Sequence, residues 1–196
     1  MQKTAEFFFD VGSPAAYLAW TQLPKICAQA QATLVYRPML LGGVFQATGN
    51  ASPMMVPAKG RYMAADLARF AVRYGATFRM NPHFPINTLQ LMRAVVGMQM
   101  QHPERFEAFL AAVYNGMWAD GVNLNDPATT AAMLVEAGFD PAQVFAMVND
   151  PAVKAALKAN TDEAVSRGVF GAPAVFVGET LFFGQDRLDF VKEALA

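Results

Sequence analysis

The chain has 196 residues, of which 54% are hydrophobic and only 16% are charged. Its 15 basic and 16 acidic side chains leave a formal net charge of -1, which argues against a nucleic-acid-binding or membrane-binding surface. The length suits one domain with a sizeable insertion. We expect a large apolar surface, either shared with a second subunit in a homodimer or lining an apolar ligand pocket.

The single cysteine, Cys27, excludes an intramolecular disulfide and is expected to be a small buried residue. The N-terminus shows no basic region followed by an apolar leader, and no uninterrupted apolar run reaches about 18 residues. We therefore expect a cytoplasmic protein that does not cross a membrane.

The N-terminal segment predicts a strand that leads directly into a helix. The strand, Ala5–Asp10, is rich in phenylalanine. Ser13 is suited to be the N-cap of the helix because a proline follows it at the first helical position. The helix is predicted from Pro14 to about Gln29, with Pro24 as a possible point of kinking or division.

A mostly helical block follows the second strand, which is predicted over Thr33–Arg37. The spacing of the first two strands is that of a βαβ unit, so they are expected to be parallel. Prolines and capping residues mark the helix starts in the block. Its predicted parts are a short helix after Leu41, helices over Tyr62–Tyr74, Thr88–Met100, Pro103–Trp118 and Pro127–Ala137, and an extended segment over Ala76–Asn87.

The C-terminal part predicts a helix, a β-hairpin and a final helix. The first helix runs from Pro151 to about Arg167. Strands over Ala174–Val177 and Thr180–Phe183 are separated by a tight turn and form an antiparallel hairpin. The last helix begins at Gly184–Arg187.

Without the helical block, the order is βαβ followed by αββα, which is the thioredoxin arrangement. We therefore predict an α/β protein with a thioredoxin-like fold and a large all-helical insertion. Residues 1–40 and 151–196 are expected to form the thioredoxin-like domain, and residues 41–150 the helical insertion domain.

Several motifs in the chain resemble one enzyme family. They are Phe-Asp-Val-Gly-Ser-Pro-Ala-Ala-Tyr-Leu at residues 9–18, Thr48-Gly49-Asn50 with Pro57-Ala58-Lys59-Gly60, and Phe170-Gly171-Ala172-Pro173 followed by Gly184-Gln185-Asp186-Arg187. Together they resemble 2-hydroxychromene-2-carboxylate isomerases, which belong with kappa-class glutathione transferases in the DsbA-like thioredoxin superfamily.

The resemblance implies glutathione as the cofactor. Ser13 stands where DsbA-like oxidoreductases have the first cysteine of Cys-x-x-Cys, and the tetrapeptide from Ser13 to Ala16 contains no sulfur. Thiol–disulfide exchange by the enzyme itself is therefore excluded. A hydroxyl at a helix N-terminus can instead hydrogen-bond the glutathione thiolate. The alternative is that Ser13 serves only as an N-cap.

Two C-terminal segments are expected to bind the rest of glutathione. Pro173 resembles the cis-proline of thioredoxin folds, and Ala172 would offer its backbone N–H and C=O to the cysteinyl part. The segment after the hairpin would hold the carboxylate and the ammonium of the γ-glutamyl end. Its residues are Gly184, Gln185, Asp186 and Arg187, and the alternative is an ordinary capped helix start.

The residues predicted to contact a small aromatic carboxylate substrate lie in the helical block. Lys59 is expected to hold a carboxylate, of the substrate or of the glutathione glycine, and Asn50 to hydrogen-bond the substrate. Tyr62 is a weaker candidate, and His83 can line the pocket. Alternatively, Lys59 and Asn50 are an ordinary solvated lysine and a turn residue. No metal site is expected, because His83 and His102 lack partners at metal-ligand spacing.

The predicted function is a glutathione-dependent isomerase acting in the breakdown of naphthalene and other aromatic compounds. The family reaction interconverts 2-hydroxychromene-2-carboxylate and trans-o-hydroxybenzylidenepyruvate. One alternative is a kappa-like glutathione transferase, which consumes glutathione. Another is a non-catalytic thioredoxin-fold binding protein, which would not bind glutathione.

Overall fold

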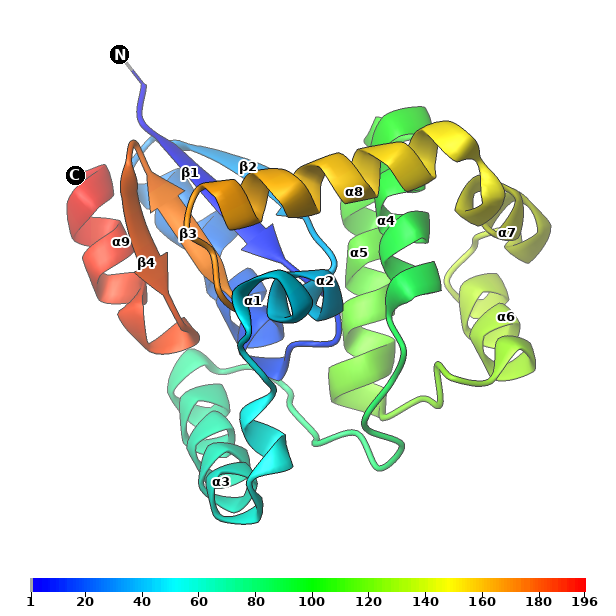
Figure 1. The fold of residues 1–196 in the computed structure, drawn as a ribbon, viewed down its shortest axis with the longest axis horizontal. Helices are drawn as coiled ribbons and strands as arrows, with labels where there is room; N and C mark the ends of the chain where they lie inside the picture. Colours follow the sequence, from blue (N-terminus) through cyan, green and yellow to red (C-terminus); the bar gives the residue numbers. More distant parts are fainter. Residues whose placement is uncertain (1) are drawn as a thin grey trace.

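The computed structural model describes residues 2–196 and contains a four-stranded mixed sheet (Figure 1). The strands are β1 (Thr4–Phe9), β2 (Thr33–Pro38), β3 (Ala174–Val177) and β4 (Thr180–Phe183), in the spatial order β2-β1-β3-β4. β1 is parallel to β2 and antiparallel to β3, and β3 is antiparallel to β4. The predicted parallel pair and the predicted hairpin are confirmed.

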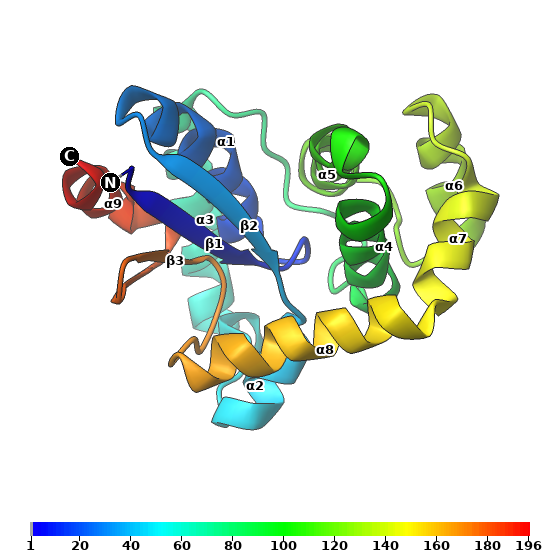
Figure 2. The ribbon, with the colours of Figure 1, turned by 90° about the horizontal axis from the view of Figure 1, so that it is seen from above.

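Helices cover both faces of the sheet. α1 (Pro14–Gln29) and α9 (Leu188–Leu195) pack on one face, and α8 (Pro151–Ser166) crosses the other (Figure 2). The remaining helices are α2 (Leu41–Thr48), α3 (Pro57–Tyr74), α4 (Leu89–Gln101), α5 (Phe106–Asn115), α6 (Pro127–Glu136) and α7 (Pro141–Asn149). Along residues 2–196, no helix combines the length and the apolar character needed to cross a membrane.

β1 is buried on both faces, which explains why its sequence shows no alternation of polar and apolar residues. Phe7 and Phe9 stack on each other in the core shared with α1 and α9. Phe8 points to the other face and packs edge-on against Phe176 of β3. All three β1 phenylalanines are fully buried. The strand that leads to the α1 N-terminus is therefore held rigidly from both sides.

The main core extends from the sheet into the helical block. Trp118, which follows α5, is fully buried and donates from Nε1 to the Val11 carbonyl oxygen at 2.7 Å. Tyr17 of α1 donates its hydroxyl to the Thr77 carbonyl oxygen at 2.6 Å. Both parts of the chain contribute to this one core, and the division into two domains at residues 41 and 150 stays a prediction.

The structure corrects the prediction at α3 and at α7, and α5 begins at Phe106, after a 3-10 turn over Pro103–Arg105. α3 begins at Pro57 and not at Tyr62, because Pro57 takes the first helical position, where its missing N–H leaves no bond unmade. α7 was not predicted. Its start is marked by Asp140, whose carboxylate accepts from the Ala142 N–H at 2.9 Å, followed by a proline at the first helical position.

α1 continues as one helix through Pro24. Its inner face carries Cys27, which is 2% exposed, as expected for a buried small residue. Burial raises the pKa of this thiol to about 11. The cysteine is therefore kept as a neutral thiol in the core at neutral pH.

The carboxyl group of Asp10 joins the segments at the starts of three helices. Its Oδ1 accepts from the Gly12 N–H at 2.8 Å, in the turn before α1. Its Oδ2 accepts from the Leu41 N–H at 2.8 Å, at the start of α2, and from the Thr88 hydroxyl at 3.1 Å, just before α4. Leu40, the N-cap residue of α2, has no side chain that can accept a hydrogen bond. Asp10, at the end of β1, accepts from the first N–H of α2 instead.

Replacing Asp10 with alanine is expected to lower the free energy of unfolding by about 3 kcal/mol, because buried donors lose their acceptor. Urea denaturation at neutral pH measures the loss. The matched control is Asp162→Ala, which removes an exposed carboxylate paired with Lys158. This control is expected to cost less than about 0.5 kcal/mol. Equal losses in the two variants would contradict the joining role of Asp10.

The pH dependence of stability gives a second prediction for Asp10. Burial raises the pKa of its carboxyl, while hydrogen bonds from Gly12, Leu41 and Thr88 oppose this rise. Between the unfolded pKa of about 4 and the raised folded pKa, the folded protein binds more protons than the unfolded protein. The stability contributed by Asp10 is therefore complete below the unfolded pKa and declines as the pH rises through the folded pKa.

The difference in free energy of unfolding between wild type and Asp10→Ala is thus expected to shrink as the pH rises above about 4. Urea denaturation of both proteins over a range of pH values measures this difference, in which the other titrating groups cancel. A difference that grows with pH would show that the hydrogen bonds lower the folded-state pKa of Asp10 by more than burial raises it.

Candidate active site

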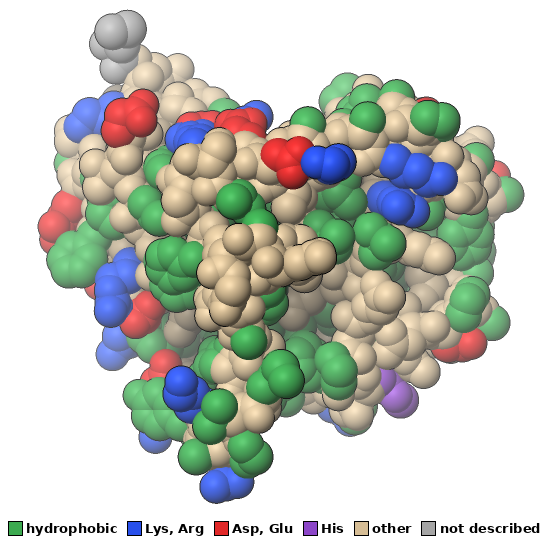
Figure 3. All heavy atoms as spheres, viewed as in Figure 1, with side chains coloured by type: hydrophobic (Ala, Val, Ile, Leu, Met, Phe, Trp, Pro, Cys, Tyr) green, Lys and Arg blue, Asp and Glu red, His purple; other side chains and the backbone are tan. Residues whose placement is uncertain are grey.

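A cavity of about 630 Å³ lies where the N-termini of α1 and α2, helix α3 and the loop before α4 meet. The face of the molecule drawn in Figure 3 has a hollow near its middle, with hydrophobic side chains around it. Part of the wall comes from Gly12–Ala15 at the start of α1, and part from Gly171–Ala172 and Phe183–Asp186. The volume falls within the range of about 300–1,000 Å³ that is usual for small-molecule sites.

Ser13 lies in the cavity wall and is 5% exposed. Its Oγ accepts from the Ala16 N–H at 3.1 Å, so the predicted N-cap is confirmed. The same hydroxyl donates to the Ala172 carbonyl oxygen at 3.0 Å. Capping alone accounts for only one of these two hydrogen bonds. The second one brings the α1 N-terminus against the segment that precedes β3.

The first turn of α1 offers a further donor to the cavity. The Ala15 N–H has no hydrogen-bond partner among residues 2–196, and Ala15 lines the cavity beside Ser13. Pro14 occupies the preceding position and has no N–H. The unpaired N–H and the positive end of the helix dipole favour an anion at this point.

Ala172 and Pro173, which precede β3, were expected to lie against the N-terminus of α1. The Ala172–Pro173 peptide bond is cis. The Ala172 N–H has no partner within the described part of the chain, and its carbonyl oxygen accepts the Ser13 hydroxyl. Pro173 is buried outside the cavity lining, and its carbonyl oxygen accepts from the Gly184 N–H at 3.0 Å. This bond draws the end of β4 to the site.

The last helix begins differently from the prediction, because a 3-10 turn over Gln185–Arg187 precedes α9. Asp186 lines the cavity, and its carboxylate forms an ion pair with Arg187, which does not line it. Tyr74 of α3 donates its hydroxyl to the Gln185 carbonyl oxygen at 2.5 Å and fixes the turn. The predicted ligand contacts of this segment stay predictions, with Asp186 and Gln185 at the cavity and Arg187 outside it.

Asn50 lines the cavity at the start of the loop that follows α2. Its side-chain Nδ2 donates to the Phe170 carbonyl oxygen at 2.8 Å, and its Oδ1 accepts from the Ala51 N–H at 2.8 Å. The amide therefore fastens the α2 loop to the segment before the cis-proline. Its predicted contact with the substrate stays a prediction.

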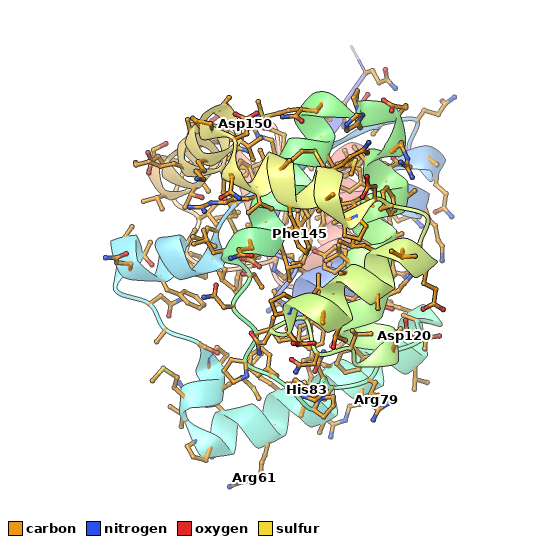
Figure 4. The ribbon with its side chains drawn as sticks, turned by 90° about the vertical axis from the view of Figure 1, so that its right-hand side faces the viewer. Arg61, Arg79, His83, Asp120, Phe145 and Asp150 are labelled. Carbon is orange, nitrogen blue, oxygen red and sulfur yellow. The ribbon has the colours of Figure 1, made fainter. Side chains whose placement is uncertain are left out.

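Three predicted substrate contacts lie outside the cavity lining, namely Lys59, Tyr62 and His83. Lys59 and Tyr62 are exposed on α3, and Tyr62 is 65% exposed. His83 is exposed in the loop before α4 (Figure 4). The helix residues that α3 contributes to the wall are Met63 and Leu67. The geometry therefore gives no support to these three contacts.

The apolar part of the wall was not predicted. It is formed by side chains from α2, α3, α4 and the loops between them, and the loops contribute runs of consecutive residues. The helical spacing of four residues between Met63 and Leu67 was a usable signal, but loop positions carry no periodicity. The apolar lining residues of these segments are Leu40, Leu41, Phe45, Ala51, Pro53, Met54, Met63, Leu67, Met80, Phe84, Pro85, Ile86 and Leu89.

The charged side chains in the described lining of this cavity are both acidic, Asp10 and Asp186. Burial raises the pKa of the Asp10 carboxyl, while its three hydrogen-bond donors oppose this rise. The lysines Lys154 and Lys158 lie on α8 at a separate groove, and cationic side chains gather over this helix in Figure 3. An anion in the cavity would thus meet N–H, amide and hydroxyl donors. Within residues 2–196, no group of His, Cys, Asp and Glu side chains is arranged to hold a metal ion.

Comparison with curated proteins shows relatives over the full length. The chain is 31% identical over 198 residues to 2-hydroxychromene-2-carboxylate isomerase of Sphingobium xenophagum, covering 100% of this chain and 99% of the relative. It is 28% identical over 211 residues to glutathione S-transferase kappa 1 of Homo sapiens, covering 100% of this chain and 92% of the relative.

Comparison with solved structures gives the same picture. A 2-hydroxychromene-2-carboxylate isomerase matches with a TM-score of 0.85 and 26% identity, covering 98% of this chain and 94% of that one. The fold is also shared with DsbA of Pseudomonas aeruginosa, with a TM-score of 0.59 and 15% identity over 98% of this chain and 81% of that one. A family model described as the DSBA-like thioredoxin domain matches residues 4–196. This match, together with the thioredoxin-like sheet and its helical block, shows that the chain belongs to the DsbA-like thioredoxin family.

Proposed function

We propose that the protein is a glutathione-dependent isomerase that interconverts 2-hydroxychromene-2-carboxylate and trans-o-hydroxybenzylidenepyruvate. The observation that carries the proposal is the Ser13 hydroxyl at the N-terminus of α1, placed against Ala172 at the edge of a mostly apolar cavity. The relatives named as isomerases and kappa transferases support an enzyme of this kind. A serine at this position leaves thiol chemistry to a bound cofactor.

The residues at the site fit glutathione. The Ala172 N–H lacks a partner among the described residues and lies next to the hydroxyl of Ser13, where an extended peptide can pair with it. The Ala15 N–H, also without a partner in residues 2–196, and the α1 dipole favour a negatively charged sulfur. Asp186 supplies a carboxylate at the rim for an ammonium group.

Bound glutathione would supply a thiolate that adds reversibly to the conjugated enone of the substrate. Ser13 would hold this sulfur by turning its hydroxyl proton from the Ala172 carbonyl oxygen toward it, while the Ala16 N–H keeps the Ser13 oxygen in place. Each unit by which the site lowers the pKa of the bound thiol corresponds to about 1.4 kcal/mol of preference for the thiolate. The apolar wall excludes water and packs against the aromatic ring.

A kappa-like glutathione transferase is the second candidate. The observation that favours it is the cavity lining, in which Asp10 and Asp186 are the charged residues among those described. A carboxylate substrate meets no lysine, arginine or histidine on that wall, whereas an uncharged aromatic electrophile needs none. The transferase shares the glutathione site but consumes the thiol.

Replacing Ser13 with alanine is expected to lower turnover at saturating glutathione by about 10- to 100-fold, since a hydrogen bond to a charged sulfur is worth roughly 1.5–3 kcal/mol. The pKa of the bound glutathione thiol is expected to rise in the same variant. Turnover under saturation and thiolate absorbance as a function of pH measure the two effects.

The cap lost in Ser13→Ala also costs stability, about 1 kcal/mol. Asp140→Ala is the matched control, because it removes the cap of α7 far from the cavity. This control is expected to lose similar stability and keep its turnover. Unchanged turnover in Ser13→Ala would refute the role of Ser13. No heat of binding with millimolar glutathione would instead favour the non-catalytic binding protein.

The total glutathione concentration separates the two enzyme functions. With 2-hydroxychromene-2-carboxylate, the isomerase is expected to complete many turnovers while free glutathione stays constant, because the thiol is released in every cycle. A thiol titration before and after the reaction measures this. Loss of one glutathione per product formed, with an uncharged aromatic electrophile as the better substrate, would assign the transferase instead.

A further inference from the structure

A second and smaller cavity lies within the helical block, bounded by α4, α5, α6 and α7. Its volume is about 260 Å³. Five of its apolar wall residues, Leu91, Phe109, Val113, Leu134 and Val144, are each at most 7% exposed and so belong to the core. Protein interiors hold few voids larger than a water molecule, so an opening of this size among core side chains calls for an explanation.

The lining of this smaller cavity is uncharged throughout, and key polar groups in it already have partners. Asn125 donates to the Pro85 carbonyl oxygen at 3.2 Å and accepts from the Asn87 N–H at 3.0 Å. The Thr130 hydroxyl donates to the Asp126 carbonyl oxygen at 3.0 Å. The apolar side chains of the inner wall offer no hydrogen bond to a water molecule, so an apolar molecule is the better occupant of that part.

The smaller cavity is reached from the surface. Phe145 of α7 lies half-buried in its lining, on the side of the molecule that faces the viewer in Figure 4. Gln90, at the start of α4, is exposed and also lines it. The cavity therefore opens to the surface beside these residues.

We propose that this smaller cavity is a binding site for an uncharged apolar molecule of about one aromatic ring. An engineered apolar cavity of about 150 Å³ holds benzene, so the larger volume here is sufficient. The site is separate from the one at Ser13 and does not depend on glutathione. The two cavities share Asn87 and Leu89 in their linings, so an occupant of the smaller one touches a wall of the larger one.

Ala94 of α4 provides the test, because it lines the smaller cavity and is 3% exposed. Toluene titrated into the methyl-labelled wild type is expected to shift the NMR signals of Val113, Leu134 and Val144 in a saturable way. In Ala94→Leu, the added methyl groups fill the space. The toluene affinity is then expected to fall at least tenfold while the melting temperature stays equal or rises. Ala94→Val is the milder filler if leucine prevents folding.

Met63→Trp is the control, since it narrows the cavity beside Ser13 and leaves the smaller one open. Toluene is expected to shift the same three methyl signals in this variant. The proposal is overturned if the wild type shows no saturable shift, because the void is then a packing gap. It is also overturned if the shifts persist unchanged in folded Ala94→Leu, or disappear in folded Met63→Trp.

Discussion

The buried carboxyl group of Asp10 is the constraint on which the rest of the site depends. It accepts hydrogen bonds from the turn before α1, the start of α2 and the residue before α4, which are three sides of the same cavity. Burial of an acid is unfavourable unless donors surround it, so these three segments have one arrangement that satisfies it. The position of Ser13, three residues further on, follows from this arrangement and from the rigid β1 that carries both.

The site combines a redox fold with a side chain that cannot carry out redox chemistry. The helix N-terminus and the cis-proline segment remain in place, while Ser13 replaces a thiol with a hydroxyl. Holding an anion is the function that we propose for this position, because a helix N-terminus favours negative charge. We propose that the apolar wall from α2 and α3 selects the molecule that meets that anion. The charged residues of the described lining, Asp10 and Asp186, lie elsewhere, after β1 and in the turn before α9.

The elements that the sequence predicted correctly are those governed by neighbouring residues. Ser13 followed by proline predicted the α1 start, and the turn between β3 and β4 predicted their hairpin. The signals that were missed at α3 and α7 were also local. Pro57 marked the true start of α3, and Asp140 with its following proline marked α7. Both signals were present but lay outside the segments whose periodicity was most regular.

The sequence alone determined the fold class, the N-cap at Ser13 and the absence of sulfur in the tetrapeptide from Ser13 to Ala16. These depend on residue type and on spacings of a few residues, which act through local backbone geometry. Only the tertiary structure decided which distant residues form the cavity wall, placing Met63 and Leu67 there and leaving Lys59 in solvent. The reason is that a cavity forms where several elements pack together, and the direction in which each side chain then points depends on every other element in the core.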